Sequence, residues 1–461
     1  MTWVAADLMM TTTFSVDAPI SAGWRRIRNY VVNKNSKTFS LNNFTEFRIQ
    51  MLNWANRFNI FCLLDNQQYN FTTPAFECLL AAGCKKNIEL PYGNAFEKFR
   101  QFYNQEKGWL FGHLGYDLKN ETEKLQSENF DGIGFADLHF FVPEIVIELK
   151  EKQVTVYCDG NADKIFAEIK AASTVITETK QKVVIENRIS KNDYINTIEK
   201  LRQHILLGDC YEINFCQEFY AIDTVIEPMA VYHKLTTLSP NPFAALYKLN
   251  DRYCICASPE RYLKKEGNRI FSQPIKGTSR RDLVNADQDL LNRNFLSENE
   301  KEKSENVMVV DLVRNDLSRV CKEGTVKVEE LFGIYSFPQV HQMISTVSGE
   351  VKDELDYIDI IKATFPMGSM TGAPKKRVME LIERYEQTKR GLFSGAIGYI
   401  RPGGDFDFNV VIRSILYNAT AKYLSFETGS AITFYSDAEK EYEECLMKAA
   451  AMMKVLHVNH S

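Results

Sequence analysis

A lysine and a glutamate on two consecutive strands could form a reactive pair. The segment ASPERYLKKEGNRIFSQPIKGT, residues 257–278, is typical of a β-hairpin that turns near Gly267 and brings Glu260 close to Lys276. A three-residue turn places both side chains on one face and a two-residue turn places them on opposite faces, while Pro274 interrupts the ladder. The pair is either an ordinary cross-strand ion pair or an acid and an amine in one cleft, where burial can make the lysine nucleophilic or basic.

Four carboxylates recur three residues apart in two segments that we expect to be helical. Glu302 and Glu305 share one helical face, and Glu441 and Glu444 share another, with Lys448 one turn further along the second helix. Two such helices can converge on a hard cation such as Mg²⁺, which accepts one or two carboxylates and keeps waters for an anionic substrate. From spacing alone, solvated surface is the commoner explanation of such pairs.

Three further segments carry groups that suit an anion. Residues 366–374, PMGSMTGAP, place glycines before a helix expected near Pro374, although they lack the order of a phosphate-binding Walker loop and a turn would also require glycine. The segment ETGSAIT, residues 427–433, lets the backbone approach a ligand closely. Arg413 lies in the apolar strand FNVVIRSI, where an arginine usually faces an anion such as a ligand carboxylate.

The elements that must position these residues follow from hydrophobic spacing and caps. A helix is expected to begin after Ser190 and to end at Gly208, and further helices are expected over residues 299–320 and 437–454. Strands are expected in CYEINFCQEFYAI, FAALYKL and YCICASPERYL, between residues 210 and 263. The fold class is therefore α+β, with two or more mixed sheets flanked by helices.

Composition excludes several classes of protein. The 461 residues are 45% hydrophobic and carry a net charge of −5, which predicts a large buried core and no nucleic-acid partner. The 10 cysteines are scattered without a CxxC pair, which favours reduced thiols over a disulfide frame or a zinc site. No signal peptide or membrane-spanning stretch is evident, so we expect a cytoplasmic protein without a membrane partner. A weak boundary at Thr177–Lys182 predicts two regions, 1–180 and 181–461.

The motifs, taken in order, resemble those of the chorismate-utilising enzymes, the family of the anthranilate synthase, aminodeoxychorismate synthase and isochorismate synthase large subunits. The resemblance runs from Ser190 to Met453 through GDCYEINFCQEF, SPERYL, PIKGT, ENVMVVDLVRNDLSRV, MGSMTGAPKKRVMELI, RGLFSGAIGYI, FNVVIRSI and GSAIT…EKEYEECLMK. It implies two mixed or antiparallel sheets packed together and flanked by helices, the anthranilate-synthase-like fold. Region 1–180 then resembles the N-terminal part of anthranilate synthase component I, and 181–461 is the chorismate-binding catalytic region.

The lysine of PIKGT discriminates within that family. Anthranilate synthases typically carry alanine there, whereas the enzymes that aminate chorismate at C4 typically carry lysine, here Lys276. The resemblance implies that Lys276 attacks C2 of chorismate while Glu260 assists loss of the C4 hydroxyl, after which ammonia adds at C4 and the lysine is expelled. The product, 4-amino-4-deoxychorismate, serves p-aminobenzoate and folate synthesis. The alternative is anthranilate synthase component I of tryptophan biosynthesis, which aminates C2 and releases pyruvate.

The resemblance also assigns a metal site and a substrate site. Glu305 and Glu444 match direct Mg²⁺ ligands, and Glu302 and Glu441 match the carboxylates beside them. Thr278 is expected to shape the pocket beside the lysine. The groups expected to hold chorismate are Tyr399, Arg413, Gly429, Ser430, Ala431 and Lys448.

The sequence differs from the family pattern at Glu212 and Gln342, and no glutaminase segment is found in it. Glu212 stands where relatives have glutamine or a general-base lysine, which argues against water as the nucleophile, and Gln342 stands where many relatives have histidine, one residue after His341. The roles of these three residues are left open. No glutaminase-like nucleophile elbow is found, so ammonia is expected from a separate glutamine amidotransferase subunit or from solution.

Overall fold

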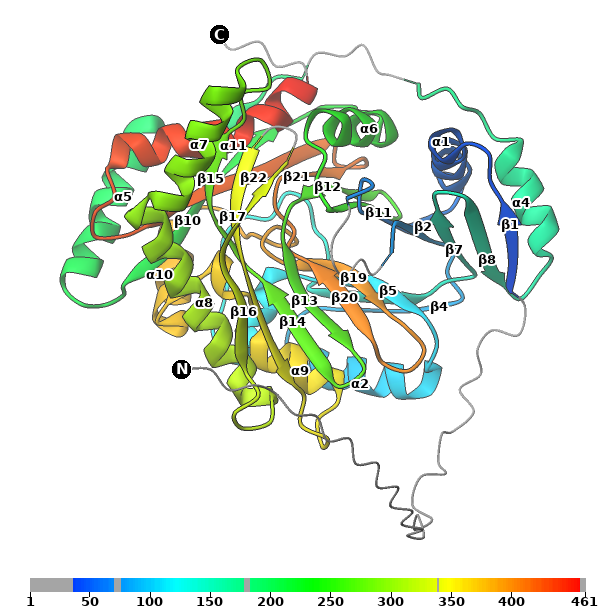
Figure 1. The fold of residues 1–461 in the computed structure, drawn as a ribbon, viewed down its shortest axis with the longest axis horizontal. Helices are drawn as coiled ribbons and strands as arrows, with labels where there is room; N and C mark the ends of the chain where they lie inside the picture. The colour runs from blue at the N-terminus through cyan, green and yellow to red at the C-terminus, as the bar shows by residue number, and fades with distance from the viewer. Residues whose placement is uncertain (1–35, 70–75, 178–182, 338–339, 457–461) are drawn as a thin grey trace, which may run out of the picture.

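Two β-sheets pack face to face and helices flank them (Figure 1). The structure, a computed structural model, describes residues 36–69, 76–177, 183–337 and 340–456. Every pairing between its named strands is antiparallel. The expected α+β class with two packed sheets is therefore confirmed.

The first sheet has 12 strands and provides one wall of the site. Its strands lie in the order β1 (Ser36–Ser40), β8 (Gln153–Cys158), β7 (Ile145–Lys150), β3 (Cys78–Ala82), β2 (Ile60–Asp65), β11 (Phe243–Leu249), β12 (Arg252–Ser258), β21 (Ser414–Asn418), β22 (Tyr423–Ile432), β10 (Glu212–Ala221) and β18 (Gly372–Ala373), with β9 (Glu186–Asn187) beside β10.

The second sheet has 10 strands and carries the hairpin with the lysine and the glutamate. Its order is β15 (Ile275–Arg280), β17 (Val340–Glu350), β14 (Arg269–Gln273), β13 (Arg261–Glu266), β20 (Phe406–Asn409), β19 (Ala396–Ile400), β5 (Leu110–Leu114), β6 (Leu138–Val142) and β4 (Lys86–Leu90), with β16 (Lys327–Ser336) beside β17.

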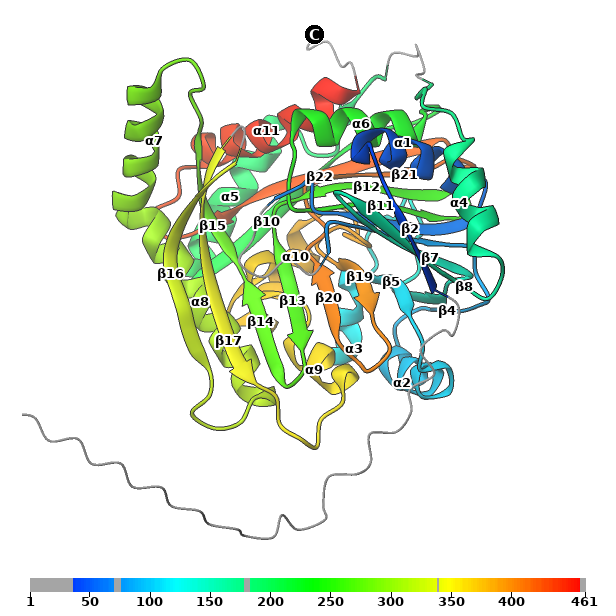
Figure 2. The same ribbon diagram turned by 45° about the vertical axis from the view of Figure 1, so that its right-hand side comes forward.

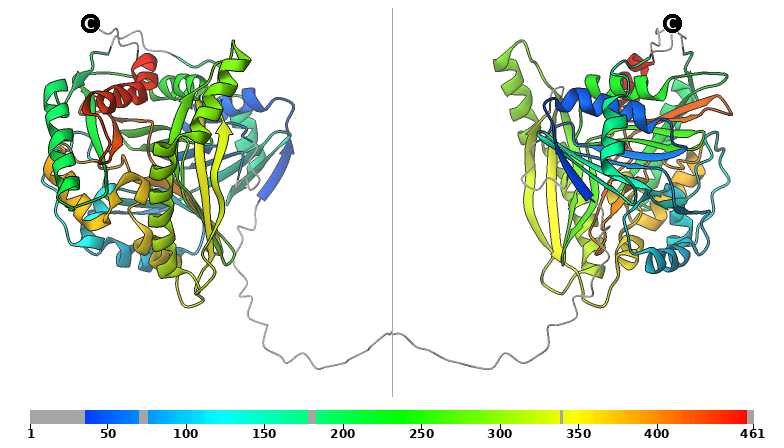
Figure 3. Two further views of the ribbon diagram at one scale, coloured as in Figure 1. Left: turned by 60° about the vertical axis from the view of Figure 1, so that its left-hand side comes forward. Right: turned by 90° about the vertical axis from the view of Figure 1, so that its right-hand side faces the viewer.

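Helices cover both outer faces of this pair of sheets. They are α1 (Phe44–Ala55), α2 (Ala95–Glu106), α3 (Lys119–Glu123), α4 (Ala162–Lys170), α5 (Lys191–Leu206), α6 (Pro228–Leu238), α7 (Ala286–Glu298), α8 (Glu300–Val320), α9 (Tyr357–Thr364), α10 (Lys375–Tyr385) and α11 (Ala438–Val455), with short 3₁₀ turns η1 (Tyr116–Leu118) and η2 (Gly368–Met370). Helices α1, α6 and α11 lie along the first sheet (Figure 2). Helix α7 stands at the outer edge of the second sheet (Figure 3).

The apolar residues form two cores, one on each face of the first sheet. One core fills the space between this sheet and its helices, where Phe215 and Phe426 are fully or almost fully buried. The other core lies between the two sheets and joins Tyr247 and Cys256 of the first to Phe111 and Phe408 of the second. Apolar side chains cover the face of each sheet that meets the other sheet. This packing holds in place the strand edges that form the site.

Strands from both sides of residue 180 share each sheet. In the first sheet β2 pairs with β11, with Leu63 opposite Leu246, and in the second sheet β5 pairs with β19, with Gly112 opposite Gly398. The expected boundary segment falls mainly on residues 178–182, which lie outside the described residues, as does the start of the chain. The division into regions 1–180 and 181–461 stays a prediction.

Local signals predicted three helices, of which α8 and α11 carry site residues. Ser190 caps α5, since its side chain accepts a hydrogen bond from the Asp193 amide, and Gly208 with a φ of 81° follows the end of this helix. The expected helices 299–320 and 437–454 are observed as α8 and α11, so both are confirmed. Within the described residues, no helix combines the length and apolarity that crossing a membrane requires.

Candidate active site

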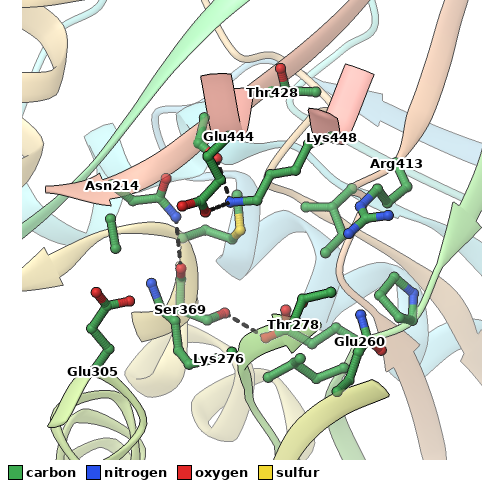
Figure 4. Close-up of a pocket in the computed structure, with 18 of the residues that line it drawn as sticks. Asn214, Glu260, Lys276, Thr278, Glu305, Ser369, Arg413, Thr428, Glu444 and Lys448 are labelled. Atoms are coloured by element: carbon green, nitrogen blue, oxygen red, sulfur yellow. Dashed lines mark hydrogen bonds and ion pairs between the residues drawn. The ribbon is translucent and has the colours of Figure 1, made fainter. Parts of the chain in front are cut away.

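A cavity lies between the edges of the two sheets, with α11 on one side and α8 on the other (Figure 4). Strand β15 and the residues before β13 form one side, and β10 and β22 form the other. Most of the predicted site residues line it: Glu260, Lys276, Thr278, Glu302, Glu305, Arg413, Gly429, Ala431, Glu444 and Lys448. Segments far apart in the sequence therefore bring an amine, four carboxylates, a guanidinium and a second amine into one space.

Three predicted residues do not line this cavity. Ser430 lies between Gly429 and Ala431 on β22, so the alternation of the strand turns its side chain to the other face, beside Tyr194. Glu441 lies one turn of α11 before Glu444 and is 2% exposed. The lining of the cavity therefore includes neither Ser430 nor Glu441.

Tyr399, which was expected to bind the substrate, lies in a buried core and does not line the cavity. It is 3% exposed on β19, opposite Phe111, and its ring packs on Trp109 and Phe76 at centroid distances of 5.8 and 5.7 Å. Phe393, six residues earlier in the segment RGLFSGAIGYI, lines the cavity instead. Tyr399 was expected to hold chorismate from the resemblance to the family, whereas strand β19 turns its side chain into the core between the sheets.

The position of Lys276 depends on three local irregularities. The hairpin turn has two residues, because Glu266 pairs with Arg269, and a register shift in β13 between Arg261 and Lys264 then realigns the strand. After Pro274 the chain no longer pairs with β13 and continues along β17 as β15, with a second register shift between Ile275 and Thr278. A two-residue turn was expected to separate Glu260 and Lys276, yet the bulge and the break at Pro274 bring both to the cavity.

Gly277 follows the lysine because no larger residue fits there. Its φ is 91°, in the left-handed region that favours glycine, and a Cβ atom would lie 3.0 Å from Oε2 of Glu302 and 3.1 Å from Cδ1 of Leu296. Helix α8 can therefore approach β15 closely enough to place its carboxylates beside the lysine.

Lys276 is held by a carboxylate that the sequence had left without a role. Its Nζ donates a hydrogen bond to Oε1 of Glu212 on β10 at 2.9 Å, and the two side chains are 11% and 2% exposed. Burial alone would lower the pKa of Lys276, but the charges of Glu212, Glu305 and Glu260 outweigh burial and raise it. In this state the lysine is a buried ammonium that must lose a proton before it can act as a nucleophile.

Glu260 has the properties of a proton donor. It is 4% exposed, and its Oε1 accepts a hydrogen bond from the Ser369 hydroxyl at 2.6 Å. Burial raises the pKa of Glu260 to about 7, although Ser369 and Lys276 act in the opposite direction. A carboxyl group with this pKa is substantially protonated at neutral pH and can donate its proton to a leaving hydroxyl.

The carboxylates of α8 and α11 suit a divalent cation in their chemistry. Burial raises the pKa of Glu305 to about 7, and Glu305 Oε1 and Glu441 Oε2 are buried without a hydrogen bond. The amine of Lys301 lies 3.7 Å from Glu305 and 3.6 Å from Glu441. As the described side chains stand, no three potential ligands converge on one metal position. Lys301 is thus the cation beside these carboxylates, and Mg²⁺ would add the direct contacts that their buried oxygens lack.

Two cationic groups face the cavity from the first sheet and α11. Lys448 donates to Oε1 of Glu444 at 2.7 Å and to the Gly429 carbonyl at 2.8 Å, and its charge lowers the pKa of Glu444. Arg413 has a φ of 53°, unusual for a residue other than glycine, and its guanidinium forms no hydrogen bond or ion pair within the described part of the chain. Since burial lowers the pKa of Arg413, an anion in the cavity would relieve an uncompensated charge.

The side chains of the neighbouring residues His341 and Gln342 point in different directions. Gln342 lies opposite Thr278 on β17 and lines the cavity, with its Oε1 buried and without a hydrogen bond. His341 points away, where it bonds to Ser336 and Asp289 at 2.8 and 3.1 Å. His341 is therefore a structural residue, and Gln342 offers an amide to a ligand.

The sequence matches a protein family over most of its length. Residues 60–454 match the family described as chorismate binding enzyme. The chain belongs to this family. It is therefore an enzyme that acts on chorismate, and the cavity between its two sheets is the candidate site for that substrate.

The relatives include both aminodeoxychorismate synthases and anthranilate synthases. This chorismate-binding enzyme is 32% identical to aminodeoxychorismate synthase component 1 of Bacillus subtilis over 390 residues, 81% of each chain. It is also 32% identical to anthranilate synthase component 1 of Acetivibrio thermocellus over 374 residues, 76% of this chain and 75% of the relative. Overall identity therefore does not select between the two reactions.

Solved structures agree with the fold. The crystal structure of anthranilate synthase component I from Streptococcus pneumoniae superposes with a TM-score of 0.67 at 24% identity, over 94% of this chain and 95% of the other. The menaquinone-specific isochorismate synthase of Escherichia coli superposes with a TM-score of 0.72 at 14% identity, over 92% and 95%. At these identities the superpositions establish the fold alone.

Proposed function

We propose that this chorismate-binding enzyme aminates chorismate at C4 to form 4-amino-4-deoxychorismate, with Lys276 as the nucleophile. The observation that carries the proposal is the amine of Lys276 in the wall of the cavity that also contains the buried carboxyl of Glu260. An amine beside an acid suits a reaction in which one bond forms while another is protonated and breaks.

The proposed sequence of steps uses each of these groups once. Glu212, 2.9 Å from Lys276, accepts the proton that makes the amine neutral. The Lys276 amine then attacks C2, the ring double bonds shift, and the C4 hydroxyl leaves as water with the proton of Glu260. Ammonia adds at C4, the double bonds shift back, and the C2–N bond breaks to release the lysine. The enolpyruvyl group stays on the product because no step breaks its bond.

Mg²⁺ is part of the proposal as a resident ion. Glu305 and Glu444, with Glu302 and Glu441 beside them, would hold it, since two of these four carboxylates have buried oxygens without a hydrogen bond. When bound, the ion would neutralise the ring carboxylate of the substrate. Arg413 and Lys448 are the protein cations available to the other carboxylate.

Anthranilate synthesis is the second candidate, because relatives with that name are as similar as those that make aminodeoxychorismate. It requires ammonia to enter at C2. In the proposed orientation the Lys276 side chain takes the place where a nucleophile for C2 would approach, so the geometry favours amination at C4.

The proposal also includes a separate glutamine amidotransferase subunit as the source of ammonia. It places the enzyme in the cytoplasm and its product in folate synthesis.

The product identifies the reaction. Purified protein is incubated with chorismate, MgCl₂ and ammonium, and products are separated by chromatography and identified by mass. We expect aminodeoxychorismate with its enolpyruvyl group intact and no release of pyruvate. Intact-mass measurement without ammonium is expected to show protein plus chorismate less one water, and Lys276→Ala should lose this adduct. Fluorescent anthranilate with stoichiometric pyruvate would overturn the proposal.

A further inference from the structure

A second, much smaller cavity lies beside the active-site cavity, on the same face of the paired strands β10 and β22. Its lining includes Phe130 and Lys389 toward the surface, and Glu218 and Ser425 on the paired strands β10 and β22. Phe130 is 51% exposed, so this end reaches solvent. One residue, Glu427, lines both this cavity and the active-site cavity. Its carboxylate therefore stands between the two spaces.

Glu427 has no protein partner for its carboxylate. It is 4% exposed on β22 and forms no hydrogen bond or ion pair with any residue that the structure describes. Glu218, directly opposite on β10, is by contrast satisfied by the Tyr423 and Ser425 hydroxyls at 2.9 and 2.7 Å. A buried, unpartnered carboxyl group that lines a cavity is costly unless a ligand with hydrogen-bond donors fills it.

The charges around Glu427 come from four elements. Burial raises the pKa of Glu427 well above its ordinary range, and the charges of Glu386 and Glu218 act in the same direction. Arg390 lowers it, but this guanidinium already donates to both oxygens of Glu386, at 2.9 and 2.6 Å, and Asp117 opposes it. Burial therefore favours the protonated form of Glu427, and a cation beside it would favour the carboxylate.

The size of the second cavity limits its occupant. The space open to the centre of a water-sized molecule is about 10 Å³, room for about one such molecule. Chorismate is far too large, whereas ammonia, ammonium and water fit. The lining also includes the cations Lys389 and Arg390, but Arg390 is bound to Glu386. Arg188 pairs with Glu218. Within the described lining, Glu427 is therefore the acceptor left without a partner, and ammonium, with four donors and a positive charge, meets a carboxylate there better than water does.

We propose that this second cavity is an ammonium site that feeds the active-site cavity, and that Glu427 is the base that takes the proton from ammonium. The N–H bond breaks, the proton passes to a carboxylate oxygen of Glu427, and neutral ammonia with its lone pair enters the active site. Glu427 returns the proton to water through the end of the cavity near Phe130. This inference rests on the proposed amination, because it supplies the ammonia which that reaction consumes.

The test separates formation of the lysine adduct from amination. Full-length wild type and Glu427→Gln are first incubated with chorismate and MgCl₂ without ammonium, and the adduct is quantified by intact mass. Ammonium chloride is then added at a series of concentrations between pH 6.5 and 9. We expect the variant to form the adduct normally, but to lose about a hundredfold in kcat/KM for ammonium at neutral pH. This loss should diminish as rising pH increases the fraction of free ammonia.

Two further variants make the result specific. Leu416→Phe, which adds bulk to the wall of the small cavity, should raise the KM for ammonium and leave the KM for chorismate unchanged. Asp65→Asn is the control, because Asp65 is also buried, lines neither cavity and is not among the charges that act on Glu427. Wild-type ammonium dependence in both Glu427→Gln and Leu416→Phe would overturn the inference and leave the cavity a site for water. If the wild type makes anthranilate, the proposed product is wrong, while the ammonium dependence of that reaction still tests Glu427.

Discussion

The amine of Lys276 donates to Oε1 of Glu212 at 2.9 Å, across the boundary between the two sheets. This ion pair joins β15 of the second sheet to β10 of the first, and both partners are almost completely buried. It holds the lysine in the cavity but keeps it protonated. The pair therefore sets the pH at which the lysine can react.

Replacing Glu212 should shift the pH dependence of adduct formation. The Glu212→Gln variant removes the carboxylate that raises the pKa of Lys276 most, so the neutral amine becomes available at lower pH. We expect the rising limb of the rate profile to move toward acid by about one to three pH units. The rate of adduct formation is measured by intact mass in a buffer series. An unchanged profile would show that Lys276 loses its proton by another route.

Glu260 should act as the acid in the same step. Because its pKa lies at about 7, the protonated form predominates below that pH, and the rate of adduct formation should fall as pH rises above it. Glu260→Gln is expected to lower the rate by about 10²–10⁴-fold and to remove this falling limb. Glu266→Gln is the control, since Glu266 lies on the same hairpin with its side chain 65% exposed and should react normally.

Arg413 should contribute mainly to chorismate binding. Its guanidinium faces the cavity without a hydrogen bond to the described protein, so a substrate carboxylate would gain charge-assisted bonds. Arg413→Gln should weaken binding by about 2–3 kcal/mol, close to a hundredfold in Kd by titration calorimetry. Arg401→Gln, which changes a guanidinium stacked on Trp109 outside this cavity, should leave Kd unchanged. Equal effects of the two would remove the special role of Arg413.

Kinetic measurements can distinguish the roles of Phe393 and Tyr399, the two aromatic residues of the segment RGLFSGAIGYI. Phe393 lines the cavity, so Phe393→Ala should raise the KM for chorismate about tenfold through lost contact area. Tyr399→Phe removes only a hydroxyl in the core between the sheets and should leave KM and kcat unchanged. A large kinetic effect of Tyr399→Phe would instead favour the role first expected of it from the sequence.

Mg²⁺ should couple to protein stability through Glu305. Burial raises the pKa of Glu305 to about 7, so the folded protein binds more protons than the unfolded chain between its ordinary pKa, 4.5, and that value. The contribution of Glu305 to stability therefore falls as pH rises across this window. In Glu305→Gln this part of the pH dependence should be absent from thermal unfolding curves.

The ion should reverse that loss where Glu305 is ionised. At pH 8, MgCl₂ at about a hundred times its Kd should stabilise the wild type by about 2.7 kcal/mol, and the gain should shrink below about pH 7 because protons compete for the carboxylate. CaCl₂ at the same concentration serves as the comparison ion. If Glu305→Gln gains as much from MgCl₂ as the wild type, Glu305 is not a ligand.

The sequence by itself determined the secondary structure of the site and most of its chemistry. Helical spacing and caps predicted α5, α8 and α11. The hairpin pattern brought Glu260 near Lys276, and Arg413 stood out as a charge in an otherwise apolar strand. These signals are local: a cap, a period of 3.6 residues or a proline in a ladder acts over a few residues, so it can be read without the rest of the chain.

Only the tertiary structure decided which of these residues meet. The two-residue turn and the bulge in β13 depend on pairing with β14 and β20, and the path of β15 depends on β17, which follows more than 60 residues later. Likewise, Glu212 and Lys276 approach because two sheets pack together, and Glu427 lines two cavities because both lie along the same face of β22. Strand register turns side chains to one face or the other, and register is set by long-range pairing and core packing, which no local pattern encodes.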